Sequence, residues 1–186
     1  MYELIATVEL ALWFGLPAWI ANSTPVVFGG GRPIDGGKLF RDGRRILGDG
    51  KTIRGLFAGV FFGTLTGLVQ SFLVPCILPV LDDYITVTGE ILYVLDMNWA
   101  VALLLSVGAM LGDLVGSFLK RRIGLVSGGP SPVLDQLGFI LIALIVVYPL
   151  KQVQPVYVLA LLLLTLFTHW VSNALGYLLG LKKNPW

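Results

Sequence analysis

The chain has 186 residues, of which 56% are hydrophobic, and a mean hydropathy of +0.84. Charged residues make up 13% of the chain, about half the share found in an ordinary soluble domain. A soluble protein of this size needs more polar surface than this to cover its core. The composition therefore excludes an ordinary soluble domain and indicates a protein whose solvent is partly lipid.

Five apolar runs follow one another along the chain. They cover residues 1–21, 55–81, 99–119, 137–150 and 155–181. A helix needs roughly 20 apolar residues to cross the hydrocarbon core of a bilayer. Four of the five runs reach that length outright. The run at residues 137–150 reaches it only if it includes residues 133–136 or tilts little, which places Asp135 near or inside the membrane. The first run lacks a basic start and an obvious cleavage site, so we expect a retained span and not a signal peptide.

The basic residues mark one side of the membrane. Seven lie in the loop 22–54, three follow the third run and two follow the fifth, which accounts for all of them except Lys151. With five spans these residues share one face, and the positive-inside rule assigns that face to the cytoplasm. The opposite loop, residues 82–98, has acidic residues and no base.

We therefore predict an all-α, polytopic membrane protein with about five transmembrane helices. The N-terminus is expected outside and the C-terminus in the cytoplasm. Residues 1–186 form a single integral-membrane domain in this prediction, with cytoplasmic loops at about 22–54 and 120–134.

Small residues recur at four-residue intervals in three of the runs. The stripes are Gly55, Gly59, Gly63 and Gly67; Gly108, Gly112 and Gly116; and Ser172, Gly176 and Gly180. Small residues let helices approach closely in lipid, where hydrophobic burial does little to hold helices together. We expect these spans to form the tightly packed centre of the bundle. No internal repeat is evident, which disfavours a transporter built from paired halves.

The loop 22–54 carries more than topology requires, because eight glycines lie among its seven bases. A flexible backbone with exposed N–H groups and nearby cations suits a polyphosphate. Lys38, Lys51 and Arg54 are candidates for phosphate contacts by charge. The plainer alternative is a loop that touches anionic lipid headgroups.

Two aspartates lie inside or at the edge of apolar runs. Asp113, Ser117, Lys120 and Arg121 share one face of the third span, and Asp135 and Gln136 begin the fourth. An aspartate at mid-membrane costs about 2.5–3.5 kcal/mol on insertion scales, so each carboxylate needs a partner. One alternative is an intramembrane ion pair, for example from Asp113 to Arg54 or Lys51. The other is a hard cation such as Mg²⁺, shared by both carboxylates and a phosphate.

The fifth run contains His169 and Asn173, which lie one helical turn apart. A histidine in a membrane helix is most often a hydrogen-bonded packing element. The alternative is a contact with a substrate that arrives from the bilayer.

At these residues the chain resembles a known family. Ser117-x-x-Lys120-Arg121 followed by Asp135 is similar to the signature of CTP:phosphatidate cytidylyltransferases, although Gly138 stands where that signature ends in a carboxylate. The resemblance to the archaeal branch, the CDP-archaeol synthases, is closer and covers nearly the whole chain. Its landmarks here are Asn22 with Pro25, Pro33-x-Asp35, Asp42-Gly43, Gly50-Lys51-Thr52-x-Arg54-Gly55, Gly112-Asp113-x-x-Gly116-Ser117-x-x-Lys120-Arg121 and Asp135-Gln136.

This resemblance implies a five-span enzyme that transfers CMP from CTP to a lipid phosphate and releases pyrophosphate. The lipid carries two geranylgeranyl chains in ether linkage to glycerol, and the family uses Mg²⁺. Its partners are then CTP, the lipid phosphate and the bilayer, with no nucleic acid, and the sequence leaves the oligomeric state open.

The expected site residues fall into three groups. Lys51, Arg54, Lys120 and Arg121 are the catalytic candidates, and Asp113 and Asp135 are the candidate metal ligands. Asn22, Lys38, Ser117, Gln136, His169 and Asn173 are the candidates for substrate binding. A lipid phosphate is already ionised near neutral pH and needs no strong general base. We therefore expect catalysis by positioning and charge stabilisation.

Two other functions stay open. A CDP-alcohol phosphotransferase also combines membrane helices, Mg²⁺ and aspartates, but its Asp-Gly-x-x-Ala-Arg motif is only partly matched at Asp42-Gly43-Arg44-Arg45. A small ion or metabolite transporter would account for Asp113 and Asp135 but not for the glycine-rich basic loop.

Overall fold

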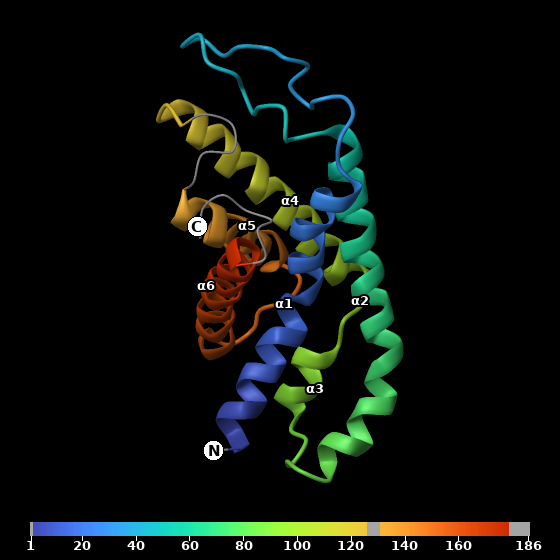
Figure 1. Cartoon of the computed structure of the whole chain (residues 1–186). Coiled ribbons are helices and arrows are strands. Elements are labelled where there is room, and N and C mark those ends of the chain that lie inside the picture. Colours follow the sequence, from blue (N-terminus) through green and yellow to red (C-terminus); the bar gives the residue numbers. More distant parts are fainter. Residues whose placement is uncertain (1, 126–130, 179–186) are drawn as a thin grey trace.

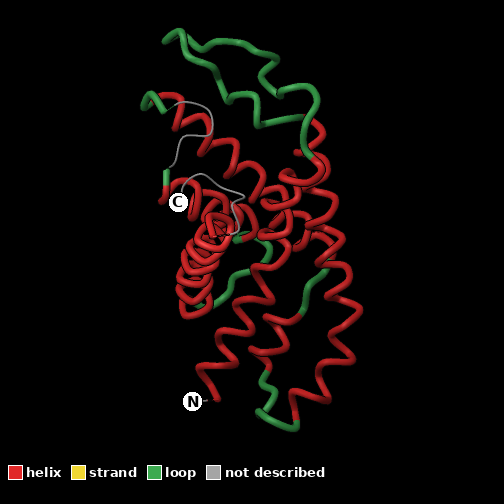
Figure 2. Tube along the Cα trace, viewed as in Figure 1, coloured by secondary structure: helices red, strands yellow, loops and turns green. Residues whose placement is uncertain are grey.

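The structure, a computed structural model, describes residues 2–125 and 131–178. These residues contain six α-helices and the loops that connect them. The helices are α1 (Tyr2–Phe28), α2 (Ile53–Asp82), α3 (Gly89–Leu95), α4 (Trp99–Arg122), α5 (Pro132–Val147) and α6 (Pro155–Leu178). The all-α prediction is confirmed. The connection between α1 and α2 lies at one end of the bundle, and α3 and the N-terminus lie at the other (Figure 1; helices in red in Figure 2).

Among the described residues, four helices are long and apolar enough to cross a membrane, namely α1, α2, α4 and α6. The fourth predicted span corresponds to α5, which has 16 residues and is a shorter apolar helix. It begins at Pro132 and holds Asp135 in its first turn. The structure thus supports a multi-pass helical protein with four candidate spans and one shorter apolar helix.

The first helix is longer than predicted. α1 continues to Phe28, so the connecting loop begins at residue 29, and the expected loop start at residue 22 is wrong. Pro25 lies inside this helix and lacks the N–H that would donate to the carbonyl of Ala21. That carbonyl instead lies where Gly59 of α2 packs closely. The hydroxyl of Thr24 donates to the carbonyl of Ile20 at 2.6 Å, so the helix continues through this turn.

A second proline inside α1 is accommodated in the same way. Pro17 leaves the carbonyl of Trp13 without its helical donor. The side chain of Gln70 on α2 donates to this carbonyl at 2.8 Å. A neighbouring helix thus satisfies the carbonyl that Pro17 releases, as a bilayer requires.

The glycine stripe of α2 packs against α1 and α4. A Cβ on Gly63 would lie 2.4 Å from the hydroxyl of Ser106 and 2.7 Å from the carbonyl of Pro17. A Cβ on Gly67 would lie 2.3 Å from Ala102. The opposite face of α2 exposes large apolar side chains, among them Phe57, Phe61, Val69 and Phe72. One face of α2 therefore packs on protein and the other faces lipid.

The predicted centre of the bundle is only partly correct. α2 and α4 lie there as expected, but α6 packs mainly against α1 and α5, and α1 takes the expected place of the fifth span. Of the most apolar stretch of α4, 56% is buried, against 17% of that of α6. The stripe on the fifth run did not identify the central helix, because small residues permit close packing without requiring it.

The end of the bundle opposite the loop contains a helix that the sequence analysis did not predict. α3 is capped by Thr88 and is joined to α1 by a hydrogen bond from the indole of Trp13 to the carbonyl of Leu95. The ammonium of Lys151 donates to the carbonyl of Asp96 and lies 4.7 Å above the ring of Tyr93. Burial lowers the pKa of Lys151. Lys151 is thus a buried contact between α3 and the α5–α6 connection.

The packing of α4 on α5 predicts the effect of one methyl group. A Cβ on Gly112 would lie 2.6 Å from the carbonyl oxygen of Gly138 and from the Cα of Phe139. Because both are backbone atoms, Gly112→Ala should separate the two helices and destabilise the protein by about 1–3 kcal/mol. The matched control is Gly89→Ala, where an added Cβ meets nothing within 4 Å. Thermal unfolding in detergent measures both variants, and an equal loss in the two would contradict this packing.

Candidate active site

The connection between α1 and α2 is an ordered loop of residues 29–52. Two isolated antiparallel bridges, Pro33 with Thr52 and Leu39 with Arg45, bring its outgoing and returning limbs together. Thr52 also caps α2, because its hydroxyl accepts from the amide of Gly55 at 3.1 Å. These contacts fix the position of the residue just before α2.

The carboxylate of Asp35 organises the interior of this loop. It accepts hydrogen bonds from the amides of Gly37, Leu47 and Gly48, and both of its oxygens accept from the guanidinium of Arg45 at 2.8 and 3.2 Å. The side chain of Asp35 is fully buried. The Arg45 hydrogen bonds, and then the three amides, lower the pKa of Asp35 far below its ordinary value despite its burial. Asp35 is therefore ionised and structural.

The first of the two membrane aspartates forms an ion pair with the loop. The ammonium of Lys51 lies 2.6 and 2.8 Å from the two carboxylate oxygens of Asp113 on α4. Each side chain is about one quarter exposed. This is one of the ion pairs that the sequence analysis left open, and it joins the cation of the loop to the carboxylate of the membrane helix.

The second aspartate is also paired. The ammonium of Lys120 on α4 lies 2.5 Å from Asp135 on α5, and the amide of Ser131 donates to the other carboxylate oxygen at 3.1 Å. Asp113 and Lys120 lie two turns apart on α4, about 10 Å along its axis. The two ion pairs therefore occupy successive levels of the same helix, at the end of the bundle covered by the loop.

The other predicted residues around these pairs differ in exposure. Ser117 and Arg121 are buried on α4, between and beside the two levels. Arg54, in the first turn of α2, is exposed, and Gln136 is half-buried next to Asp135. Lys38 is exposed in the loop, and its carbonyl accepts from the amide of Ile46.

Two of the predicted substrate contacts line a separate cavity. Asn22 of α1 and His169 of α6 border a cavity of about 380 Å³, together with Ser23, Thr168 and Ser172. The apolar part of its wall includes Trp19, Val26 and Phe139, and the rings of Phe139 and His169 lie 5.9 Å apart. The side chain of Asn173 lies outside the described residues. The cavity thus combines polar groups and apolar wall between α1, α5 and α6.

A divalent cation was expected at the two aspartates. Each of them contacts a lysine, and among the described residues no three His, Cys, Asp or Glu side chains are grouped closely enough to hold an ion. Two carboxylates suffice for Mg²⁺ when phosphates and water supply the other oxygens. The residues therefore fit a cation that arrives with a phosphorylated substrate, and do not form a cage made of protein alone.

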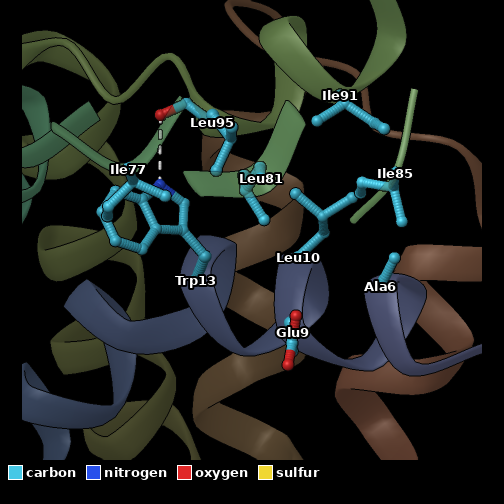
Figure 3. Close-up of a pocket in the computed structure, with 9 residues that line it drawn as sticks. All are labelled: Ala6, Glu9, Leu10, Trp13, Ile77, Leu81, Ile85, Ile91 and Leu95. Carbon is cyan, nitrogen blue, oxygen red and sulfur yellow. Dashed lines mark hydrogen bonds between the residues drawn. The ribbon is translucent and has the colours of Figure 1, made fainter. Parts of the chain in front are cut away.

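One pocket at the end of the bundle opposite the loop differs in character from the loop end. It encloses about 110 Å³ between α1, α2 and α3, and its lining is apolar apart from Glu9. Figure 3 shows the side chains of Leu10, Leu81 and Ile85 converging on it, with the indole of Trp13 engaged by Leu95. Its lining offers little to a phosphate.

The sequence analysis missed two arginines of this end. Arg44 and Arg122 were counted only as positive charge, but each donates to backbone carbonyls of the other's segment. Neither the charge pattern nor the helical spacing could indicate this contact, because the two residues are far apart in the chain. A loop phenylalanine, Phe40, and Phe118 on α4 were the available signal, since aromatic rings often stack on arginine.

The fold and the site define a helical membrane protein whose loop end holds paired cations and carboxylates suited to phosphate groups. Comparison with known families gives a more specific result. The family described as "CarS-like: CDP-archaeol synthase" matches residues 1–186. The chain belongs to the CDP-archaeol synthase family, and the resemblance drawn from its motifs is confirmed.

Individual relatives agree with this assignment. The chain is 47% identical over 182 residues to the CDP-archaeol synthase of Thermococcus kodakarensis, covering 98% of each chain. It is 48% identical over 176 residues to that of Pyrococcus horikoshii, covering 95% of each. A solved structure described as "an intramembrane enzyme for archaeal membrane lipids biosynthesis" superimposes with a TM-score of 0.72 at 39% identity, covering 88% of this chain and 92% of that one.

The buried carboxylate of Asp35 predicts a pH-dependent loop. Because its folded pKa is depressed, its contribution to loop stability is complete at neutral pH and is lost as the pH falls below about 4, where the unfolded carboxyl takes up a proton. Asp35→Asn should remove this contribution at pH 7 and speed hydrogen exchange at the amides of Leu47 and Gly48.

The control for this prediction is Asp49→Asn. Asp49 also pairs with Arg45, at 2.8 Å, but its side chain is 78% exposed, so its loss should matter little. Exchange rates measured at pH 7, and down to pH 3 after correction for intrinsic exchange, check both statements. Equal protection in wild type and Asp35→Asn would show that the carboxylate does not hold the loop.

Proposed function

We propose that this chain transfers CMP from CTP to a lipid phosphate with two ether-linked geranylgeranyl chains, giving CDP-archaeol and pyrophosphate. The observation that carries the proposal is the pair of lysine–aspartate contacts at the loop end, within a chain that belongs to the CDP-archaeol synthase family. The lysines supply cations at two levels of α4, and the aspartates supply oxygen ligands beside them.

The charges of the substrates explain why the site needs these cations. A lipid phosphate carries roughly −1.5 to −2 near neutral pH, and CTP adds about −4. Lys51 and Lys120 can exchange their carboxylate partners for phosphate oxygens, and exposed Arg54 and neighbouring Arg121 add positive charge. An oxygen of the lipid phosphate attacks the α-phosphorus of CTP as the bond to pyrophosphate breaks. No side chain has to remove a proton from the ionised lipid phosphate.

Mg²⁺ is the cofactor that we propose for this reaction. Asp113 and Asp135 would hold it, and its charge would neutralise the phosphate oxygens of the triphosphate. The exchange described above supports this assignment, because each carboxylate becomes available for a cation when its lysine turns to a phosphate.

The membrane orientation is part of the proposal. We place the loop end in the cytoplasm, the N-terminus outside and the C-terminus inside, with α5 as a short fifth span. The basic residues of residues 29–54 and of the end of α4 support this orientation by the positive-inside rule. CTP, a cytoplasmic nucleotide, then reaches the loop end from water.

The lipid is proposed to reach the site from the side. The cavity between α1, α5 and α6 offers Asn22 and His169 to the polar glycerol region and its apolar wall to the chains. Lateral entry lets the isoprenoid chains stay in the bilayer while the phosphate approaches the ion pairs. Among the predicted contacts, Asn22 and His169 therefore belong to the lipid.

The first test uses the two aspartates. Asp113→Asn and Asp135→Asn should each lower Mg²⁺-dependent formation of CDP-lipid from labelled CTP at least about a hundredfold, because the carboxylate charge beside the phosphates is lost. Membrane insertion should be retained in both variants. Asp82→Asn, at the opposite end of α2, is the control with an unchanged rate.

This assay separates the other functions as well. A CDP-alcohol phosphotransferase would consume a CDP-lipid instead of forming one, and a transporter would form no lipid product from CTP. Full activity in either aspartate variant would refute the metal assignment.

The second test uses the lateral cavity. Ser172→Trp places a large side chain on its wall and should raise the KM for the lipid phosphate roughly tenfold, since the occupied volume is no longer open to the substrate. The KM for CTP should stay the same. Phe167→Trp adds bulk to an exposed position of the same helix and should change neither constant. Steady-state kinetics in mixed micelles measure all three proteins, and an unchanged lipid KM in Ser172→Trp would place the lipid elsewhere.

A further inference from the structure

The tip of the loop is a hairpin, residues 38–46, that is docked on the C-terminal end of α4. The amide of Phe40 donates to the carbonyl of Arg44 at 2.7 Å, and the amide of Ile46 donates to that of Lys38 at 3.2 Å. Figure 1 shows the loop lying over the end of α4. The contacts between the hairpin and α4 hold the cations of the loop next to the cations of α4.

One arginine reaches from α4 into the hairpin. The guanidinium of Arg122 donates to the carboxylate of Asp42 at 2.9 Å and to the carbonyl of Arg45 at 2.5 Å. Its carbon Cζ lies 4.6 Å from the ring centre of Phe40 and 4.8 Å from that of Phe118. Protein groups thus engage both terminal nitrogens of this guanidinium, and two aromatic rings lie beside it.

The other arginine reaches back from the hairpin to α4. Arg44 donates to the carbonyls of Arg122 at 2.7 Å and Arg121 at 3.3 Å. These carbonyls belong to the last turn of α4, where a helix lacks donors of its own. The two arginines therefore cap each other's segments, and we call Arg44, Arg122 and Asp42 the arginine clamp.

The clamp is connected to both ion pairs. On the loop side, Arg45 next to the clamp binds Asp35, which holds the amides of Leu47 and Gly48, and the carbonyl of Gly48 accepts from the amide of Lys51 at 3.2 Å. On the helix side, Lys120 lies two residues before Arg122. The clamp thus sets the distance between the loop that carries one catalytic lysine and the helix end that carries the other.

We propose that Arg44 and Arg122 are positioning residues of the cytidylyl-transfer site. They do not contact the substrate but hold the loop against α4, so that the two lysines meet the phosphates of one CTP molecule together. This inference rests on the proposed function. A misplacement of about 1 Å between catalytic groups can cost on the order of a hundredfold in rate, which gives the clamp a measurable effect.

The test compares charge with geometry at Arg122. Arg122→Lys keeps the positive charge but cannot donate in a planar fork to both Asp42 and the carbonyl of Arg45. We expect Arg122→Lys and Arg122→Gln to raise the KM for CTP alike, by about tenfold, because both lose the prepositioned loop. Arg41→Gln removes the same charge from an exposed residue of the hairpin and should change the KM by less than about twofold, since exposed charges are screened.

A double variant tests the contact itself. Asp42→Asn should raise the KM for CTP in the same direction, and the double variant with Arg122→Gln should be no worse than Arg122→Gln alone, because the two residues act through one contact. Independent, multiplying effects would overturn the clamp, as would a wild-type KM in Arg122→Lys.

Hydrogen exchange without substrate distinguishes failure of the clamp from failure of the proposed function. The amides of Phe40 and Ile46 should exchange faster in Arg122→Lys than in wild type. In Arg41→Gln their exchange rates should equal those of wild type. This result requires no turnover, so it stands even if the wild-type protein forms no CDP-lipid. A raised KM with unchanged exchange would assign Arg122 to a direct substrate contact and overturn the positioning role.

Discussion

The ion pair between Lys51 and Asp113 is the interaction on which the loop end depends. A carboxylate in a membrane helix is costly unless a cation lies beside it, and removing one partner of a partly buried pair leaves the other charge uncompensated. The cation that pairs with Asp113 is Lys51, which the loop carries. The polar loop must therefore fold back over α4, and the membrane helix determines where the loop lies.

The glycine stripe of α2 brings that lysine to its partner. Gly63 packs at Ser106 and Gly59 at Met110, one residue pair after another toward the loop end. The next turn of α4 carries Asp113, and Lys51 lies two residues before the first residue of α2. Close helix packing and the ion pair are therefore two results of one register: a shift of α2 along α4 would separate the charges and bring the glycine positions into collision with larger side chains.

Much of this arrangement could be predicted from the sequence, but not the parts that depend on distant contacts. Run length and charge asymmetry identified the membrane helices, and the helical spacing placed Asp113 and Lys120 on one face. The continuation of α1 through Pro25 could not be predicted, because it depends on how α2 packs against the released carbonyl of Ala21. The clamp of Arg44 and Arg122 was missed for the same reason. A positive charge has the same appearance in a sequence whether it binds a phosphate, a lipid headgroup or a helix end.

The basic residues of the loop end therefore divide by what surrounds them. Arg44, Arg45 and Arg122 have their guanidinium groups fixed by carbonyls, carboxylates and rings, whereas Lys51 and Lys120 each hold a single carboxylate. A planar guanidinium suits fixed multidentate contacts, and an ammonium on a flexible stem can change partners with little rearrangement. In the proposed reaction, an incoming phosphate would replace one anion by another at each lysine and free the aspartate for a cation. The arginines would then keep the geometry while the lysines change partners.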